Sequence, residues 1–170
     1  GDLRTEFVMR FQQLTGPAMA KGVEDTAMYC YNRLVSLNEV GGDPGTFGRD
    51  VEAFHRTCQE MQLRRPYGML ATSTHDTKRS EDVRARINLL SEVPEQWRDA
   101  VLRWSAINAR HRTGEWPDRS AEYLFYQNLV GAWPIDADRM TAYMEKASRE
   151  AKAFTSWTRS NPAYEEALQR

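Results

Sequence analysis

The sequence predicts a mainly α-helical chain, with several helices and one short strand. Apolar residues recur at helical spacing along most of the 170 residues, and Phe7, Val8, Phe11 and Leu14 set the pattern at i, i+1, i+4 and i+7. Only residues 67–74 break it, as a short, mostly uncharged run between Pro66 and His75 that is typical of a strand.

Turn residues divide the helical pattern into segments. Gly16-Pro17 is expected to end the first helix, and a second is expected over about residues 18–37. The next helices are predicted over about 49–63, with Val51, Phe54 and Cys58 facing inward, and over about 80–90, with Ser80 as the cap. Four more are predicted: from Pro94, over about 121–131 with Gly131 near its end, over about 140–154, and from Asn161.

A single strand cannot satisfy its own backbone N–H and C=O groups. The run over 67–74 therefore either pairs with strands outside these residues or adopts another conformation. The chain also starts at Gly1 and stops at Arg170 in helix-like sequence. These features lead us to expect an internal fragment of a longer protein, with the remainder of that chain as its partner.

Bulk composition excludes few functions. The formal charge is −1, from 23 basic and 24 acidic residues, which argues against a strongly basic nucleic-acid binder. No apolar run approaches the length of a membrane span, and no secretory signal is evident. Cys30 and Cys58 are too few for a disulfide scaffold, so reduced thiols and a cytoplasmic location are expected.

The richest polar stretch follows the predicted strand, over residues 72–84. Asp76 could stabilise a developing cation, His75 could bond a substrate hydroxyl, and Lys78 or Arg79 could hold another. In α/β barrels, catalytic groups collect at the carboxyl ends of strands. Spacing alone, however, favours a charged loop and a solvated helix start, whose ion pairs contribute little.

A second polar group contains Lys21, Glu24 and Asp25. Two adjacent carboxylates beside a lysine could form an acid–base site, although an exposed helical turn is the commoner structure. The three histidines, His55, His75 and His111, lie far apart, so no metal site is predicted. No phosphate-binding glycine loop is present, and no cofactor is predicted.

Tryptophan is frequent, and each position has two interpretations. Aromatic rings stack against the apolar faces of sugars, but they also fill helical cores. Trp97 and Trp104 are at helical spacing, which favours the core. Trp116 and Trp133 lie near predicted loops and are the better candidates for contact with a sugar.

Three long strings are the most diagnostic part of the sequence: Leu14–Ala27 (LTGPAMAKGVEDTA), Tyr31–Pro44 (YNRLVSLNEVGGDP) and Met69–Arg86 (MLATSTHDTKRSEDVRAR). Tyr126–Pro134 and Arg149–Lys152 extend the match. Taken in this order, they resemble maltooligosyltrehalose synthases, isomerases of the α-amylase superfamily that act in trehalose biosynthesis. The resemblance departs from the family pattern at Met28, Cys30 and Phe154.

The resemblance implies a position within a (β/α)8-barrel enzyme. Residues 1–90 would be the late part of the catalytic barrel, with the strand over 67–74 and the helix that follows it. Residues 91–170 would be a helical insertion subdomain that walls the cleft and limits the entry of water.

The resemblance also implies an activity. Such enzymes convert the reducing-end α-1,4 bond of a maltooligosaccharide into an α,α-1,1 bond by intramolecular transfer, without a cofactor. His75-Asp76 matches the family's transition-state-supporting pair, while the nucleophile and the acid/base would precede Gly1. Lys78, Arg79, Lys21, Glu24 and Asp25 are candidates for substrate binding.

Two alternatives stay open at this point. The parent could be another hydrolase or glucanotransferase of the superfamily, or the chain could be a helical module that binds carbohydrate or protein. In the main interpretation, one of three expected carboxylates is present, so the isolated chain is expected to be inactive.

Overall fold

A computed structural model describes residues 2–170 and confirms a mainly helical chain. The longer helices are α1 (Leu3–Met19), α3 (Val51–Arg64), α5 (Pro94–Asn108), α6 (Arg119–Ala132) and α7 (Ala137–Ala151). Shorter helices are α2 (Met28–Cys30), α4 (Glu81–Asn88) and α8 (Pro162–Leu168). A π-helical segment joins α1 to α2 (Ala20–Ala27), and three 3₁₀ turns complete the helical structure (Val35–Leu37, Leu89–Ser91, Ala109–His111).

Side-chain caps explain where several helices begin. Asp50 accepts a hydrogen bond from a backbone N–H at the start of α3, and Asp118 and Asp136 do the same for α6 and α7. Asn161 caps α8 as predicted, with Pro162 as its first residue. Ser80 precedes α4 as expected, but its side chain makes no capping hydrogen bond there.

The predicted break at Gly16-Pro17 is wrong. Helix α1 continues through Pro17, and the backbone then changes to the wider π-helical pattern over Ala20–Ala27. Proline lacks one N–H, yet the chain stays α-helical for two residues beyond Pro17 before the π-helical segment begins. The predicted second helix over 18–37 is also too long, because α2 ends at Cys30.

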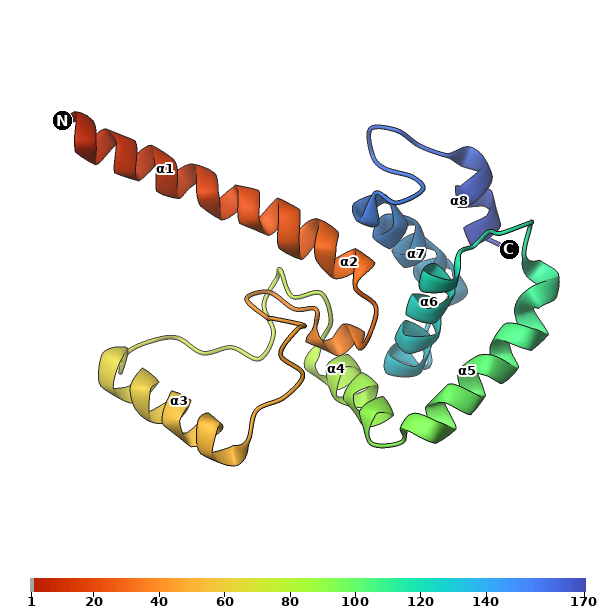
Figure 1. The fold of residues 1–170 in the computed structure, drawn as a ribbon, viewed down its shortest axis with the longest axis horizontal. Helices are drawn as coiled ribbons and strands as arrows, with labels where there is room; N and C mark the ends of the chain where they lie inside the picture. Colours follow the sequence, from red (N-terminus) through yellow and green to blue (C-terminus); the bar gives the residue numbers. More distant parts are fainter. Residues whose placement is uncertain (1) are drawn as a thin grey trace.

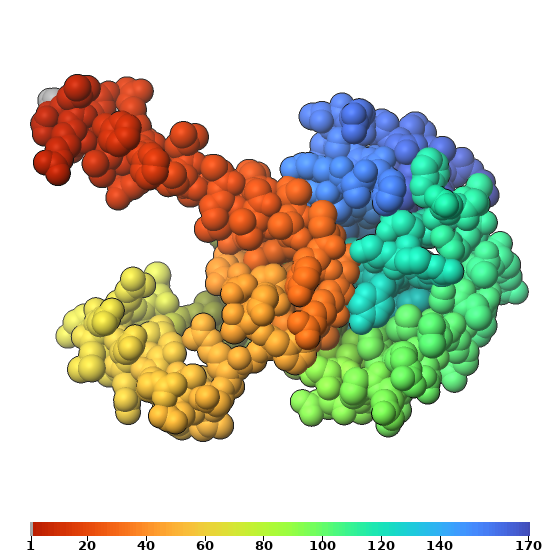
Figure 2. All heavy atoms as spheres, in the orientation of Figure 1, coloured from red at the N-terminus to blue at the C-terminus, as the bar shows by residue number. Residues whose placement is uncertain are grey.

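The chain forms one compact body with two projections (Figure 1). Helices α4 to α8 surround the core, whereas α1 extends away from it and α3 lies on a separate excursion (Figures 1 and 2). The apolar stripe of α1 is exposed, with Phe7 at 67% and Leu14 at 69%. Val51, Phe54 and Cys58 of α3 were expected to face inward but are exposed, because α3 has no core around it within residues 2–170.

The core lies between α4, α6 and α7. Ile87 and Val35 are fully buried, and Leu124, Met144 and Ala147 complete the centre of the cluster. Helices α4 and α6 approach closely at Gly131, where an added Cβ would lie 2.7 Å from Cγ1 of Ile87. Gly131 therefore permits the close packing of α4 against α6, and it lies one residue before the end of α6, as predicted.

The predicted strand over 67–74 is not formed. These residues have no strand structure, and Tyr67 and Met69 are almost fully exposed. The run therefore adopts another conformation, the second possibility stated above. With no neighbouring strand in residues 2–170, it follows an irregular path that starts in a turn and bends at Thr72. The boundary predicted near residue 90 stays a prediction, although α4 shares the core with α6 and α7.

No helix in the described part of the chain is both long enough and apolar enough to cross a membrane. Cys30 and Cys58 are both free thiols and both exposed.

Candidate functional site

The His75-Asp76 pair lies on an exposed loop between the irregular run over 67–74 and α4. The turn is closed by threonines: Thr77 Oγ1 donates to the carbonyl of Thr74 at 2.9 Å, and the N–H of Asp76 donates to Thr74 Oγ1 at 3.3 Å. Within residues 2–170, neither the imidazole of His75 nor the carboxylate of Asp76 makes a hydrogen bond to another group. The backbone of the pair is therefore held while both side chains stay available.

The structure brings Lys21 and Asp25 together with Lys78. Asp25 uses one carboxylate oxygen for each lysine: Oδ2 lies 2.6 Å from Lys21 Nζ, and Oδ1 lies 2.8 Å from Lys78 Nζ. Lys21 is exposed, whereas the side chain of Lys78 is only 11% exposed and lies over the ring of Tyr29. Two segments that the sequence analysis treated separately thus form one polar cluster.

These contacts shift the ionisation of the cluster in the expected directions. Hydrogen bonds from Lys21 and Lys78 lower the pKa of the Asp25 carboxyl. The hydrogen bond to Asp25 raises the pKa of Lys21, and the charges of Glu150 and Asp76 add to that increase. The carboxylate of Asp25 therefore bridges the side chains of Lys21 and Lys78.

Glu24 bonds to a backbone group instead of to the two lysines. Its side chain is buried, and Oε1 accepts a hydrogen bond from the N–H of Gly41 at 3.1 Å. Gly41 has φ +70, a conformation that glycine adopts at little cost. Glu24 therefore holds the loop that follows Glu39, and the polar cluster itself is formed by Lys21, Asp25 and Lys78.

Arg79 is bonded within the protein at all three guanidinium nitrogens. Nε donates to Asn128 Oδ1 at 2.9 Å, Nη1 to the carbonyl of Val35 at 3.1 Å, and Nη2 to the hydroxyl of Tyr143 at 2.8 Å. Burial raises the pKa of Tyr143, so its hydroxyl stays neutral beside the cation. Arg79 fastens the end of the loop to α6 and α7.

Sequence reasoning missed Glu39 and Arg84 as site residues. Glu39 accepts hydrogen bonds from the backbone N–H groups of Lys78 at 2.7 Å and Arg79 at 3.2 Å. Arg84 lies 3.4 Å from Glu39 Oε2 and donates to the carbonyl of Thr72. Both residues are in the diagnostic strings, but no local pattern marks a carboxylate whose partners are backbone groups 39 and 40 positions later.

The structure shows no metal-binding group among the described residues. His55 packs edge-on against Phe54 in α3, and His111 ends the 3₁₀ turn that follows α5. Trp97 and Trp104 pack together with their ring centroids 5.9 Å apart, in agreement with a packing role. Trp116 packs against Tyr164, whereas Trp133 is 63% exposed.

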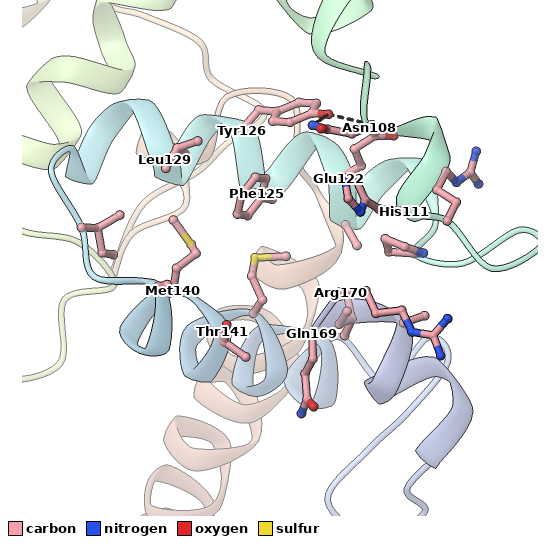
Figure 3. A pocket seen from close by; sticks show the side chains of 18 residues that line it. Asn108, His111, Glu122, Phe125, Tyr126, Leu129, Met140, Thr141, Gln169 and Arg170 are labelled. Carbon is pink, nitrogen blue, oxygen red and sulfur yellow. Dashed lines mark hydrogen bonds between the residues drawn. The ribbon is translucent and has the colours of Figure 1, made fainter. Parts of the chain in front are cut away.

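A cavity of about 470 Å³ lies between α6, α7 and the end of the chain (Figure 3). Phe125, Leu129 and Met140 form its apolar wall, and Glu122 and Arg170 lie at its polar end (Figure 3). None of the predicted site residues lines this cavity. It is therefore separate from the polar cluster around His75 and Asp76.

Comparison with known proteins identifies what the chain resembles. A solved maltooligosyltrehalose synthase from Arthrobacter ramosus is 48% identical, with a TM-score of 0.88, and the match covers 96% of this chain and 21% of that one. The chain is similar to one segment of maltooligosyltrehalose synthases. The structure of a Sulfolobus tokodaii protein of the same name gives a TM-score of 0.82 at 40% identity, covering 95% of this chain and 23% of that one.

A curated Mycobacterium tuberculosis protein carries the maltooligosyl trehalose synthase name as well. It is 42% identical over 168 residues, which is 95% of this chain and 21% of the relative. The chain thus spans about a fifth of the length of the curated relatives it matches. No family model matches the chain. The resemblance inferred from the three diagnostic strings is confirmed.

Proposed function

We propose that this chain supplies part of the active site of an intramolecular glucosyl transferase. The reaction converts the reducing-end α-1,4 bond of a maltooligosaccharide into an α,α-1,1 bond. One observation carries the proposal: a chain similar to maltooligosyltrehalose synthases over almost all its residues holds His75-Asp76 on an ordered loop with both side chains free.

In a retaining transfer, a carboxylate nucleophile and a carboxylic acid/base act through an oxocarbenium-like transition state. We assign neither role within residues 1–170, and we place both in the remainder of a longer chain of the α-amylase superfamily. Asp76 binds sugar hydroxyls and stabilises the positive charge that develops at the anomeric carbon. His75 donates a hydrogen bond to a hydroxyl of the same sugar.

Lys21 and Lys78 are proposed to bind hydroxyl groups at the reducing end. Each ammonium has three N–H donors, and Asp25 uses only one carboxylate oxygen per lysine. Asp25 holds the two cations at a fixed separation. This arrangement suits an intramolecular transfer, in which the reducing-end glucose must reorient without leaving the site. Glu24 and Arg79 act indirectly, since their polar groups are bonded within the protein.

The helices after residue 91 are proposed to wall the cleft. Exclusion of water favours transfer of the glucosyl group to another sugar hydroxyl over hydrolysis. The proposal includes a cytoplasmic location, as expected for an enzyme acting on soluble maltooligosaccharides.

Product analysis tests the proposal. Incubation of this chain alone with maltopentaose should give no non-reducing product, since two of the three carboxylates are missing. In the longer protein, Asp76→Asn should reduce kcat by about 10²-fold or more, because charge stabilisation in the transition state is lost. The matched control is Asp99→Asn, since Asp99 is an exposed carboxylate paired with its neighbour Arg98.

The outcomes separate the alternatives. Free glucose or elongated chains from the longer protein would show another hydrolase or glucanotransferase. Tight binding of maltopentaose by the isolated chain would favour a binding module. A near-normal rate in Asp76→Asn would remove Asp76 from the mechanism.

A further inference from the structure

The loop that carries His75 and Asp76 is held at both ends by one ion pair. At its end, the Glu39 carboxylate accepts the consecutive backbone N–H groups of Lys78 and Arg79, one on each oxygen. At its start, the guanidinium of Arg84 donates to the carbonyl of Thr72. Arg84 Nη1 and Glu39 Oε2 lie 3.4 Å apart, so the two anchors are joined directly.

This ion pair is well shielded from solvent. The side chain of Glu39 is 15% exposed and that of Arg84 is 19% exposed. Hydrogen bonds to a charged group are stronger than those between neutral groups, and limited contact with water preserves that difference. The pair therefore restrains the loop more firmly than a surface ion pair could.

The two anchors leave only a short turn between them. Thr74 and Thr77 close that turn, with their side chains bonded to backbone groups within it. The side chains of His75 and Asp76 project from a turn whose two ends are both fixed. A restraint of this kind sets the position of a functional group without touching the substrate.

We propose that Glu39 and Arg84 are positioning residues that hold His75 and Asp76 in place for the reaction. The inference rests on the proposed function for its chemical consequence. Reaction rates fall steeply when a functional group moves by about 1 Å, because the transition state is the most sensitive to geometry. Substrate binding, which uses Lys21 and Lys78, should be affected less.

Hydrogen exchange on this chain tests the restraint directly. Glu39→Gln replaces one acceptor oxygen with an NH₂ group, which is a donor and cannot accept a hydrogen bond from a backbone N–H. Exchange at the amides of Lys78 and Arg79 should accelerate by about 10-fold or more, since charge-assisted hydrogen bonds are lost. Exchange at the backbone amide of Gln127, which is buried within α6, should be unchanged. Unchanged exchange at Lys78 and Arg79 would overturn the proposal.

Kinetics on the longer protein test the consequence. Glu39→Gln and Arg84→Met should each lower kcat by about 10- to 100-fold with KM within about 2-fold, as expected when only transition-state geometry is disturbed. Arg84→Lys keeps the charge and should recover part of the rate. The matched control, Glu60→Gln, changes an exposed carboxylate on α3 and should leave both constants unchanged.

The two proposals fail in different ways. If the unmodified longer protein makes no trehalose-ended product, the proposed function fails while the exchange result still reports on the restraint. If exchange accelerates and kcat stays normal, the positioning role is overturned. If Glu39→Gln does not fold, Arg84→Lys decides: a kcat equal to that of the unmodified protein overturns the role, and a lowered kcat with unchanged KM supports it.

Discussion

The ammonium group of Lys78 lies 2.8 Å from Oδ1 of Asp25, a residue 53 positions earlier in the chain. The other oxygen of Asp25 binds Lys21 at 2.6 Å, so one carboxylate compensates two cations. The side chain of Lys78 is largely buried and also lies over the ring of Tyr29. Asp25 is therefore the residue on which the charge balance of the cluster depends.

Asp25→Asn should destabilise the chain by about 1–2 kcal/mol, because a largely buried ammonium loses its charged partner. Urea unfolding followed by circular dichroism measures the change. The control is Glu52→Gln, which removes the carboxylate of an exposed pair with Arg56 and should cost less than about 0.5 kcal/mol. Equal effects of the two substitutions would contradict a structural role for Asp25.

Arg79→Lys should destabilise the chain by about 2–4 kcal/mol. A lysine ammonium cannot reach Asn128, Val35 and Tyr143 together, since these three groups match the planar guanidinium. The acceptors left unpaired are buried or half-buried, which makes their loss costly. Thermal unfolding checks the effect, with the exposed Arg103→Lys as the control. A shift no larger than that of the control would show that Arg79 is not an anchor.

The helices were largely predictable, because each buries or presents an apolar stripe with helical period. The strand over 67–74 was not, since a strand needs partners and none lies within residues 2–170. The candidate site was predictable only in part. Lys21, Asp25, Lys78 and Asp76 were named as candidates mainly through the resemblance, because their spacing alone favoured a charged loop and an exposed helical turn. Glu39 was missed because the groups that it binds are backbone N–H groups, which carry no sequence signal.

The ion pair between Glu165 and Arg149 gives a pH-dependent contribution to stability. Two hydrogen bonds from Arg149, at 2.9 and 2.8 Å, and one from Thr155 lower the pKa of Glu165 to about 2. A lowered pKa in the folded state means that the contribution is complete above the unfolded value and is lost as pH falls toward the folded value. The loss should therefore occur between about pH 4.5 and 2.

Glu165→Gln should flatten this part of the stability profile. Thermal midpoints measured from pH 6 down to pH 2 should converge for the variant and the unmodified chain at the acid end. Glu166→Gln is the matched control, since Glu166 is the adjacent carboxylate and forms an exposed pair with Arg170. Profiles that stay parallel throughout would exclude Glu165 as the group responsible.

Gly131 and Gly16 both lie inside helices, and they should respond in opposite ways to alanine. Alanine favours helix over glycine by about 1 kcal/mol, which alone predicts stabilisation at both positions. At Gly131, however, a Cβ would meet Ile87 at 2.7 Å and Val83 at 3.0 Å, whereas at Gly16 nothing lies within 4 Å.

Gly131→Ala should therefore destabilise the chain by about 1–3 kcal/mol through overpacking between α4 and α6. Gly16→Ala should raise the helical circular dichroism signal and leave the unfolding midpoint equal or higher. Urea unfolding of both variants compares the two effects under the same conditions. Because the helix-propensity gain is shared, the difference between them isolates the cost of close approach at Gly131. Equal midpoints would show that α4 and α6 can move apart at little cost. The close contact at Gly131 would then not be what fixes α4 at the end of the His75-Asp76 loop.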